Sequence, residues 1–352
     1  MRTRPILAAT AAAVVAATTA LGAAAPAQAA AAPLVQGLAG PLSMSIDHGK
    51  IYVTQNFGGK LSRFGTDGSG GKTLYQRNPK VEVGGVQAEG PGTLFTVTGK
   101  NAAGKFAKLK HLAADGTVTT VADLRGFEKK FNPDGHVTYN FRDISDSCAA
   151  KVPEQVGGGS YKGIVDSHPF ATAMMDDGTA VVADAAGNDI ITVSPSGFRT
   201  EIATLPGQPK KVTQGLAAQF HLPGCTVGHR FYFEPVPTDV EVHDGLLYVT
   251  TLPGGPEDPS LGARGKVYTV DPATGDVTKI GSGFAGATDL AVSPEGKVYV
   301  TELFGGQVST IKDGVAKKVF SVPEPAAIEW HNGHLFVAGG LQGPGYIRKF
   351  TP

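Results

Sequence analysis

Apolar and polar residues alternate through many short stretches of the chain. Val240 and Val242 alternate with acidic residues at 239 and 241, and Leu290 and Val292 alternate with residues 289 and 291 in the same way. A period of two over four to eight residues predicts half-buried β-strands. Asp-Gly pairs such as Asp244-Gly245 supply the positive-φ positions of hairpin turns. The pattern therefore predicts short strands joined by tight turns.

Several segments repeat one pattern of strands and turns, in which the second strand is similar to Tyr-Val-Thr. The six copies lie at 41–64, 86–112, 171–193, 237–252, 287–311 and 325–340. A fourth strand follows the third in each copy, as at 317–322. Six repeats of four strands predict an all-β fold, a six-bladed β-propeller. An open β-solenoid is the alternative.

The two ends of the repeat region complement each other. Residues 34–40 are similar to residues 280–286, which lead into a later repeat, and the last repeat stops at Phe350 after three strands. We therefore expect the N-terminal strand to complete the final blade. Closure of this kind removes an exposed sheet edge.

Long insertions interrupt the repeats. Phe95 and Val181 occupy equivalent positions but are separated by about twice the length of a blade. A seventh blade could fill this gap, but residues 125–165 show no alternation, so we predict a long loop with a short helix near 124–131. Further insertions are expected at 206–236 and 253–265. Long loops on one face of a rigid scaffold often carry function.

Each of the two longest insertions contains one of the two cysteines, Cys148 and Cys225. An even count in an exported chain predicts a disulfide, which would staple the two insertions together. The alternative is a metal site, because His221, Cys225 and His229 follow one another at four-residue steps. That spacing aligns ligands on a helix, and the proline and glycines between them disfavour a helix.

The first residues predict export. Arg2 and Arg4 precede an uncharged, alanine-rich stretch at 6–25, and Ala27-Gln28-Ala29 matches a small-x-small cleavage site. We expect residues 1–29 to be a signal peptide and residues 30–352 to form a single secreted propeller domain without membrane insertion. A membrane anchor is the alternative.

Composition narrows the possible partners. The chain has 31 basic and 31 acidic residues and a formal net charge of zero, which argues against binding to nucleic acid. Apolar residues make up 41% of the chain, enough for a sizeable core, and its 48 glycines fit an all-β protein with many turns. We expect a monomer whose partner is a small molecule, a glycan or a protein.

Several motifs resemble the ScyD/ScyE family. They lie at 132–135, 166–169, 181–193, 237–240 and 287–292, and the resemblance extends over about residues 34–350. It implies a secreted or periplasmic propeller, and most members of the family have no assigned reaction. More distantly, the repeats resemble NHL and YVTN propellers and the SMP-30/gluconolactonase superfamily, whose lactonases use an axial divalent metal. The cysteine pair departs from members encoded in scytonemin clusters, so pigment biosynthesis does not transfer.

Candidate site residues follow from their positions in the repeat, because no standard catalytic motif is present and no catalytic residue can be assigned. Positions after the second strands, and equivalent positions on the innermost strands, meet at one mouth of a propeller channel. The former are Gln55, Asn56, Asp184, Thr251 and Glu302; the latter are Ser43, Thr172, Asp239, Asp289 and Ala327.

The carboxylates Asp184, Asp239, Asp289 and Glu302 could converge there, and such oxygens suit Ca²⁺ or another divalent cation. The alternative is that these residues bond backbone groups and tie blades together. His168 and His221 flank the insertions, where they could line a pocket or pack the loops onto the ring, and Trp330 is expected in the core between blades. Two functions remain open: an extracellular binding or scaffold protein, or a metal-dependent, lactonase-like hydrolase.

Overall fold

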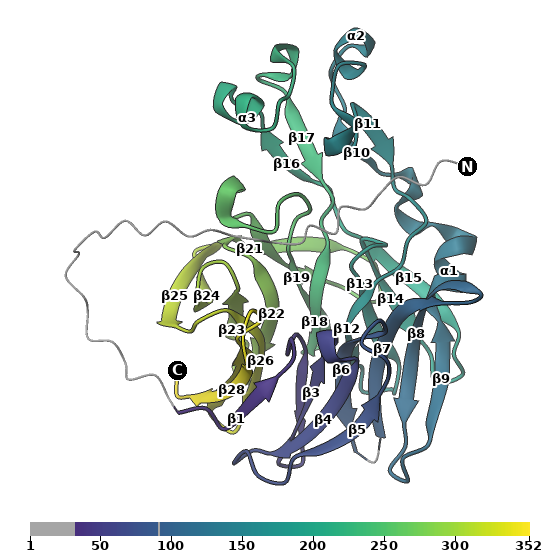
Figure 1. Cartoon of the computed structure of the whole chain (residues 1–352), viewed down its shortest axis with the longest axis vertical. Coiled ribbons are helices and arrows are strands. Elements are labelled where there is room, and N and C mark those ends of the chain that lie inside the picture. Colours follow the sequence, from purple (N-terminus) through teal and green to yellow (C-terminus); the bar gives the residue numbers. More distant parts are fainter. Residues whose placement is uncertain (1–31, 91) are drawn as a thin grey trace, which may run out of the picture. The chain divides into compact units, whose positions relative to one another are not determined.

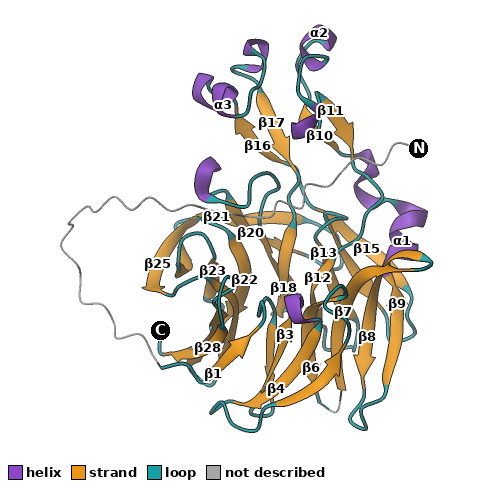
Figure 2. Ribbon diagram, viewed as in Figure 1, coloured by secondary structure: helices purple, strands orange, loops and turns teal. Residues whose placement is uncertain are grey.

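The computed structural model describes residues 32–90 and 92–352. The alternating segments form antiparallel four-stranded blades that follow one another along the chain (Figures 1 and 2). The predicted signal peptide, residues 1–29, and its cleavage site lie outside the described residues. No helix in the described part of the chain is long and apolar enough to cross a membrane.

Each blade contains four strands, which are named from the innermost outward. Blade 1 comprises β2 (Met44–Asp47), β3 (Lys50–Gln55), β4 (Lys60–Gly65) and β5 (Lys72–Gln76). Blade 2 comprises β6 (Glu82–Glu89), β7 (Gly92–Asn101), β8 (Gly104–Leu112) and β9 (Val118–Asp123). Blade 3 comprises β12 (Pro169–Met174), β13 (Ala180–Asp184), β14 (Asp189–Val193) and β15 (Arg199–Thr204). Blade 4 comprises β18 (Pro237–His243), β19 (Leu246–Thr251), β20 (Gly265–Val270) and β21 (Val277–Phe284). Blade 5 comprises β22 (Ala287–Val292), β23 (Val298–Glu302), β24 (Gln307–Lys312) and β25 (Val315–Ser321). Blade 6 comprises β26 (Pro325–His331), β27 (His334–Gly339), β28 (Gly345–Phe350) and β1 (Val35–Leu38).

The N-terminal strand closes the ring. β1 pairs antiparallel with β28, with Val35 opposite Ile347, and so supplies the outer strand of blade 6. The innermost strands contact one another in the circular order β2, β6, β12, β18, β22, β26 and back to β2. The predicted six-bladed propeller is confirmed, and the solenoid and the seventh blade are both excluded.

Tight turns join the strands as the dipeptides predict. Asp244 and Gly245 both have positive φ, 49° and 75°, which is the backbone of a type I′ hairpin. Glycine adopts this conformation without a steric penalty, and aspartate tolerates it better than most residues. Positive φ recurs at many other glycines of the described residues, so part of the high glycine content follows from turn geometry.

Apolar residues fill the seams between neighbouring blades. Val181 and Ile190 of blade 3, for example, share one buried cluster with Val249 of blade 4. Between blades 5 and 6, Trp330 stacks on Tyr299 with ring centroids 5.6 Å apart. The prediction that Trp330 belongs to the core between blades is therefore confirmed.

The insertions differ from the predicted loops, although the helix expected near 124–131 is present as α1 (Leu124–Phe131). The first insertion also contains β10 (Thr138–Phe141), α2 (Asp146–Ala149) and β11 (Ser160–Lys162), and the second contains β16 (Gln208–Lys211), α3 (Gln214–Gln219) and β17 (Arg230–Phe233). Their strands form one sheet in the order β11-β10-β17-β16, which we call the insertion sheet. These strands have three or four residues and find partners far along the chain, so no local hairpin pattern marks them.

Candidate functional site at the insertion face

One edge of the ring carries both the insertions and the candidate residues. The first two strands of each blade are antiparallel, so the first begins where the second ends; Pro169 pairs with Asp184, and Pro237 with Thr251. The two long insertions end at the beginning of β12 and β18, on this same edge (Figure 1). We call it the insertion face. The predicted placement of the insertions on one face is confirmed.

The residues at the ends of the second strands act as clamps. Three of them accept a hydrogen bond from a backbone N–H in the segment that leads into their own blade. The pairs are Gln55 Oε1 with Ala39 N at 3.0 Å, Asp184 Oδ1 with His168 N at 2.6 Å, and Glu302 Oε2 with Ala285 N at 2.6 Å. At the fourth, the Thr251 hydroxyl accepts a bond from Gln208 Nε2 at 2.9 Å. Three blades therefore use these oxygens to hold their own backbone, and blade 4 uses the Thr251 hydroxyl to hold a side chain of the insertion sheet.

Polar side chains on the innermost strands, or directly before them, tie neighbouring blades together. Asp239 Oδ2 accepts a hydrogen bond from Leu290 N in blade 5 at 2.9 Å. Ser43 Oγ accepts one from Val86 N in blade 2 at 3.1 Å. This arrangement matches the structural role that the sequence left open for these positions.

Thr172 does not occupy the position predicted for it. In blade 4, Asp239 pairs with Thr250, the residue directly before the clamp residue Thr251. In blade 3 the clamp residue is Asp184, and the residue that pairs with the position directly before it is Ala171. A shift of one residue turns a side chain to the other face of a strand. Thr172 instead donates to Val181 O within its own blade at 2.9 Å.

Four carboxyl groups, two of them buried and two half-buried, lie on the innermost strands of blades 4 to 6. The sequence singled out Asp239 and Asp289; the structure adds Glu241 and Glu329. Burial raises the pKa of Asp239 to about 6, and burial together with mutual repulsion holds the pKa of the other three well above their ordinary values. Within residues 32–90 and 92–352, no group of three or more His, Cys, Asp or Glu side chains is arranged to hold a metal ion.

A hydrogen-bonded ion pair lies at the insertion face where blades 1, 2 and 3 meet. His168 Nε2 lies 2.9 Å from Glu82 Oε2, and Asn56 Nδ2 donates to Glu82 Oε1 at 3.0 Å. His168 precedes β12, Glu82 begins β6, and Asn56 follows β3. The side chains of His168 and Glu82 are 36% and 30% exposed, so a ligand can reach them.

Each member of this pair stabilises the charged form of the other. Burial alone would lower the pKa of His168, but the hydrogen bond and charge of Glu82 raise it above 6.5. Burial alone would raise the pKa of Glu82, but His168 and Asn56 lower it below 4.5. The sequence identified Asn56 and His168 but missed Glu82, whose position at the start of an innermost strand was the available signal.

Blade 3 anchors the base of both insertions through Asn188. Its Nδ2 donates to Asp134 Oδ2 in the first insertion at 2.9 Å, and its Oδ1 accepts from Val236 N at the end of the second at 3.1 Å. Asp134 also accepts a bond from Tyr139 of β10 at 3.0 Å. One buried amide therefore links the two insertions to the ring.

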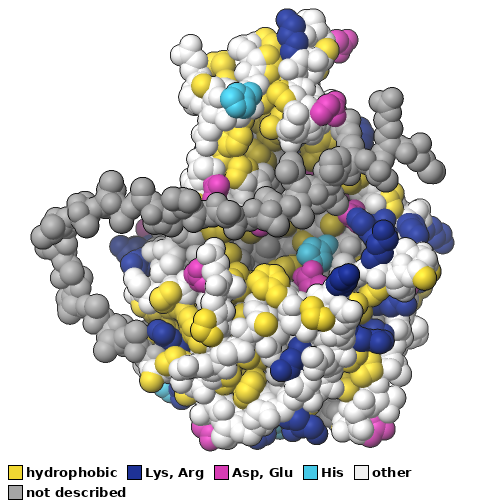
Figure 3. All heavy atoms as spheres, viewed as in Figure 1, with side chains coloured by type: hydrophobic (Ala, Val, Ile, Leu, Met, Phe, Trp, Pro, Cys, Tyr) yellow, Lys and Arg dark blue, Asp and Glu magenta, His cyan; other side chains and the backbone are white. Residues whose placement is uncertain are grey.

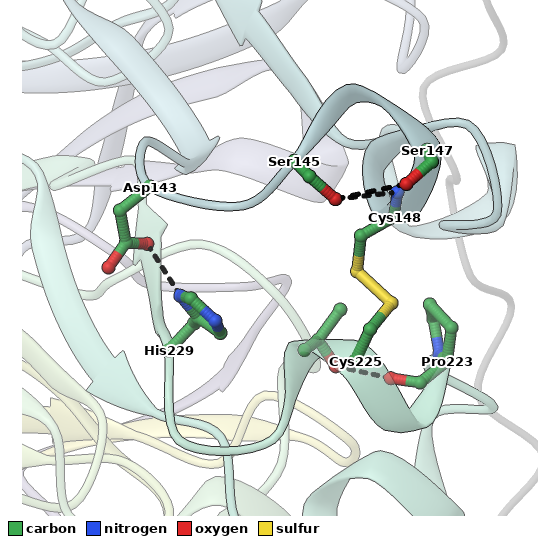
Figure 4. The surroundings of a disulfide bond; sticks show 8 residues. Asp143, Ser145, Ser147, Cys148, Pro223, Cys225 and His229 are labelled. Atoms are coloured by element: carbon green, nitrogen blue, oxygen red, sulfur yellow. Dashed lines mark hydrogen bonds and ion pairs between the residues drawn. A yellow bond between two sulfur atoms is a disulfide. The ribbon is translucent and has the colours of Figure 1, made fainter.

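A disulfide joins the two insertions at the far end of the insertion sheet (Figure 4). Cys148 of α2 is bonded to Cys225, with Cα atoms 6.0 Å apart, which is within the usual range for a disulfide. His229 instead faces Asp143, with Nδ1 3.2 Å from Oδ1. The predicted staple is confirmed, and the metal site that would have used Cys225 is not formed.

Comparison with known proteins identifies the fold. No family model matches the chain, and a search of curated proteins finds no match. Solved structures do match: a streptogramin B lyase (14% identity, TM-score 0.50, covering 90% of this chain and 84% of that one), a gluconolactonase from Xanthomonas campestris (12%, 0.53, 91% and 88%) and the Malassezia sympodialis allergen Mala s 1 (14%, 0.53, 90% and 94%). At this level of identity the likeness concerns the fold alone. The chain is a six-bladed β-propeller similar to these structures.

Proposed function

We propose that this protein is a secreted propeller that binds a ligand on its insertion face, as an extracellular binding or scaffold protein. The observation that carries the proposal is the insertion sheet, which two separate insertions build jointly on that face. The ring closes without it, through β1 and the innermost strands.

Ordering these insertions costs free energy, although the ring does not need ordered insertions in order to close. Fixing the backbone of one residue costs on the order of 1 kcal/mol. Two long segments are nevertheless held by the Cys148–Cys225 bridge, by the Asn188 amide and by a shared sheet. Long ordered loops on a rigid scaffold are most often binding elements.

A binding function is favoured over metal-dependent hydrolysis because the candidate carboxyl groups already make structural hydrogen bonds. The oxygens of Asp184 and Glu302 already hold backbone N–H groups, and Asp239 ties blade 4 to blade 5. The lactonase and lyase activities named for the similar structures belong to those proteins, because a shared propeller does not transfer chemistry.

Export of the protein, without insertion into a membrane after processing, is part of the same proposal. A disulfide persists in an oxidising compartment, which agrees with the predicted signal peptide and with the resemblance to the secreted ScyD/ScyE propellers. We propose that the mature protein begins near Ala30 and acts as a monomer, with a small molecule, a glycan or a protein as ligand.

The test is a binding screen of the secreted protein against arrays of glycans and small metabolites, followed by variants of each face. His168→Ala and Arg142→Ala alter exposed or half-exposed side chains of the insertion face, whereas Lys50→Ala alters an exposed residue at the opposite edge. We expect the first two to weaken binding at least tenfold and the third to leave it unchanged. Binding that survives both insertion-face variants, or lactone hydrolysis that depends on His168, would overturn the proposal.

A further inference from the structure

Helix α1 and the segment 163–166 together form one exposed surface. On its inner side, Leu124 and Phe127 belong to the buried cluster shared by blades 2 and 3. On its outer side, the segment runs beside the helix: Asn132 Nδ2, at the end of the helix, donates to Gly163 O at 3.2 Å. Arg125 Nη1 likewise donates to Val165 O at 3.2 Å.

Large apolar side chains project from this surface. Phe131, Ile164 and Val165 are 56%, 52% and 40% exposed. The other large apolar side chains that are comparably exposed in the described residues are distributed over other elements: Phe57, Phe198, Val227 and Val315. Three such side chains on α1 and the segment 163–166 are a local concentration of exposed apolar surface. An exposed apolar patch often marks an interaction site.

Lysines flank these apolar side chains along the chain. Lys129, Lys130 and Lys162 are exposed, and within residues 32–90 and 92–352 none of the three forms an ion pair. Lys130 Nζ lies 4.8 Å from the centre of the Phe131 ring. Lys and Arg side chains gather near α1 in Figure 3. In a chain with no net charge, this is a local positive field.

A purely local role explains only part of this arrangement. Lys129 and Lys130 lie in the last turn of α1, where positive charge stabilises a helix. That effect requires neither Lys162, which lies on β11, nor the exposure of Ile164 and Val165. We call the six residues the α1 surface: Lys129, Lys130, Phe131, Lys162, Ile164 and Val165.

We propose that the α1 surface docks this protein on an anionic lipid bilayer. Apolar side chains that project among lysines match the requirements of interfacial binding, in which the apolar groups enter the headgroup region and the cations lie at the anionic surface. An acidic peptide would instead favour a groove, and the cavity beside Leu94 and the one beside Lys210 are both lined by other side chains. This proposal rests on the proposed export of the protein, because export is what brings the chain to a membrane surface.

The test is co-sedimentation of the purified mature chain with vesicles. Vesicles of phosphatidylcholine containing about 30% phosphatidylglycerol should bind the protein, vesicles of phosphatidylcholine alone should not, and added salt should weaken binding. The variant Lys129→Gln/Lys130→Gln/Lys162→Gln should weaken binding at least about tenfold. Ile164→Ser should weaken it severalfold while leaving the salt dependence unchanged.

Matched controls come from blades 5 and 3. Lys317→Gln/Lys318→Gln removes two exposed lysines of β25, and Phe198→Ser removes an exposed aromatic residue from a hairpin of blade 3. Both should bind vesicles as the unmodified protein does. All variants should melt at unchanged temperature. The double variant Lys129→Gln/Lys130→Gln, which leaves the strands of the insertion sheet unaltered, should also weaken vesicle binding but keep the ligand binding of the insertion face, so that failure of one proposal is distinct from failure of the other.

Three results would overturn the lipid proposal. The first is a lack of binding to phosphatidylglycerol vesicles, and the second is an equal loss of binding in the control variants. The third is binding of a soluble acidic peptide, poly-glutamate, through the same lysines without any vesicle binding. That outcome would assign the α1 surface to an acidic protein partner.

Discussion

His168 and Glu82 face each other across the seam between blades 2 and 3, with Nε2 and Oε2 2.9 Å apart, although 86 residues separate them along the chain. The pair closes the seam at the insertion face, and the backbone N–H of His168 is at the same time held by the clamp residue Asp184. A ligand that approaches the pair therefore meets a polar group fixed on both sides.

This ion pair predicts that His168 loses its proton at a higher pH than an ordinary histidine does. The pKa of His168 is raised above 6.5 and that of Glu82 is lowered below 4.5, so the ion pair contributes fully between those two pH values. Its contribution is lost as pH rises through the folded pKa of His168, and also as pH falls through that of Glu82. Both side chains are about one-third exposed, so the effect on stability is on the order of 0.5 kcal/mol.

NMR titration of the His168 ring measures this shift directly. We expect a midpoint above 6.5 in the unmodified protein and a return towards 6.5 in Glu82→Gln. Asp244→Asn serves as the control, because Asp244 lies at a hairpin tip on the other edge of the ring. A His168 midpoint that Glu82→Gln leaves in place would contradict the ion pair.

Glu128 predicts a second pH dependence, in which ionisation of a buried carboxyl group destabilises the fold at high pH. Burial first, and then the charges of Asp184 and Asp134, raise the pKa of Glu128 to about 8. The group favours the folded state while it is protonated. This contribution is complete below the ordinary value of 4.5 and is lost as pH rises through about 8.

Replacement of Glu128 by glutamine removes that loss. At pH 8.5 we expect Glu128→Gln to be more stable than the unmodified protein by on the order of 2 kcal/mol, or a few degrees in Tm, and at about pH 5 to be nearly equal to it. Glu89→Gln, at an exposed position, should show no such change. Thermal unfolding at the two pH values is the measurement, and parallel curves for both variants would refute the raised pKa.

The ring could be predicted from the sequence because its signals are local. The alternation of Val240 and Val242, and the Asp244-Gly245 turn, each involve residues close together in the chain, and the repeat multiplies the signal. Closure by β1 was predictable for the same reason, since residues 34–40 are similar to a segment that leads into another blade.

The insertion sheet and the ion pair could not be predicted, because their partners are distant. Phe141 packs edge-on against Phe231, with ring centroids 5.2 Å apart, yet no spacing rule connects the two positions. Glu82 lacked a visible partner for the same reason. Thr172 was misplaced by one residue, which is enough to exchange the faces of a strand, because the hairpins of the repeat do not all have the same length: Pro169 and Asp184 are 15 residues apart, and Pro237 and Thr251 are 14 apart.

Loss of the disulfide should affect the insertions before the ring. The bridge closes a separation of 77 residues, for which the chain-entropy model gives about 4 kcal/mol. Blade 3 lies inside that loop and forms its own pairs, so we expect Cys148→Ser/Cys225→Ser to lower the free energy of unfolding by only about 1 to 2 kcal/mol. Limited proteolysis should cut first within 125–165 or 206–236. First cuts in the blades would show instead that the bridge supports the ring.

The closing strand offers the sharpest test of the fold, because adjacent residues of β1 face opposite ways. Val35 is 6% exposed and lies in a core cluster with Met44 of blade 1 and Ile347 of blade 6, whereas Gln36 is exposed. Val35→Asp places a carboxylate in that seam and should cost about 3 kcal/mol or more, because a buried charge without a partner is expensive. Gln36→Asp, the matched control, should change stability by less than about 0.5 kcal/mol. Thermal unfolding of the two variants decides the question: if both melt together, the last blade is not held by β1 and the ring closes by another route.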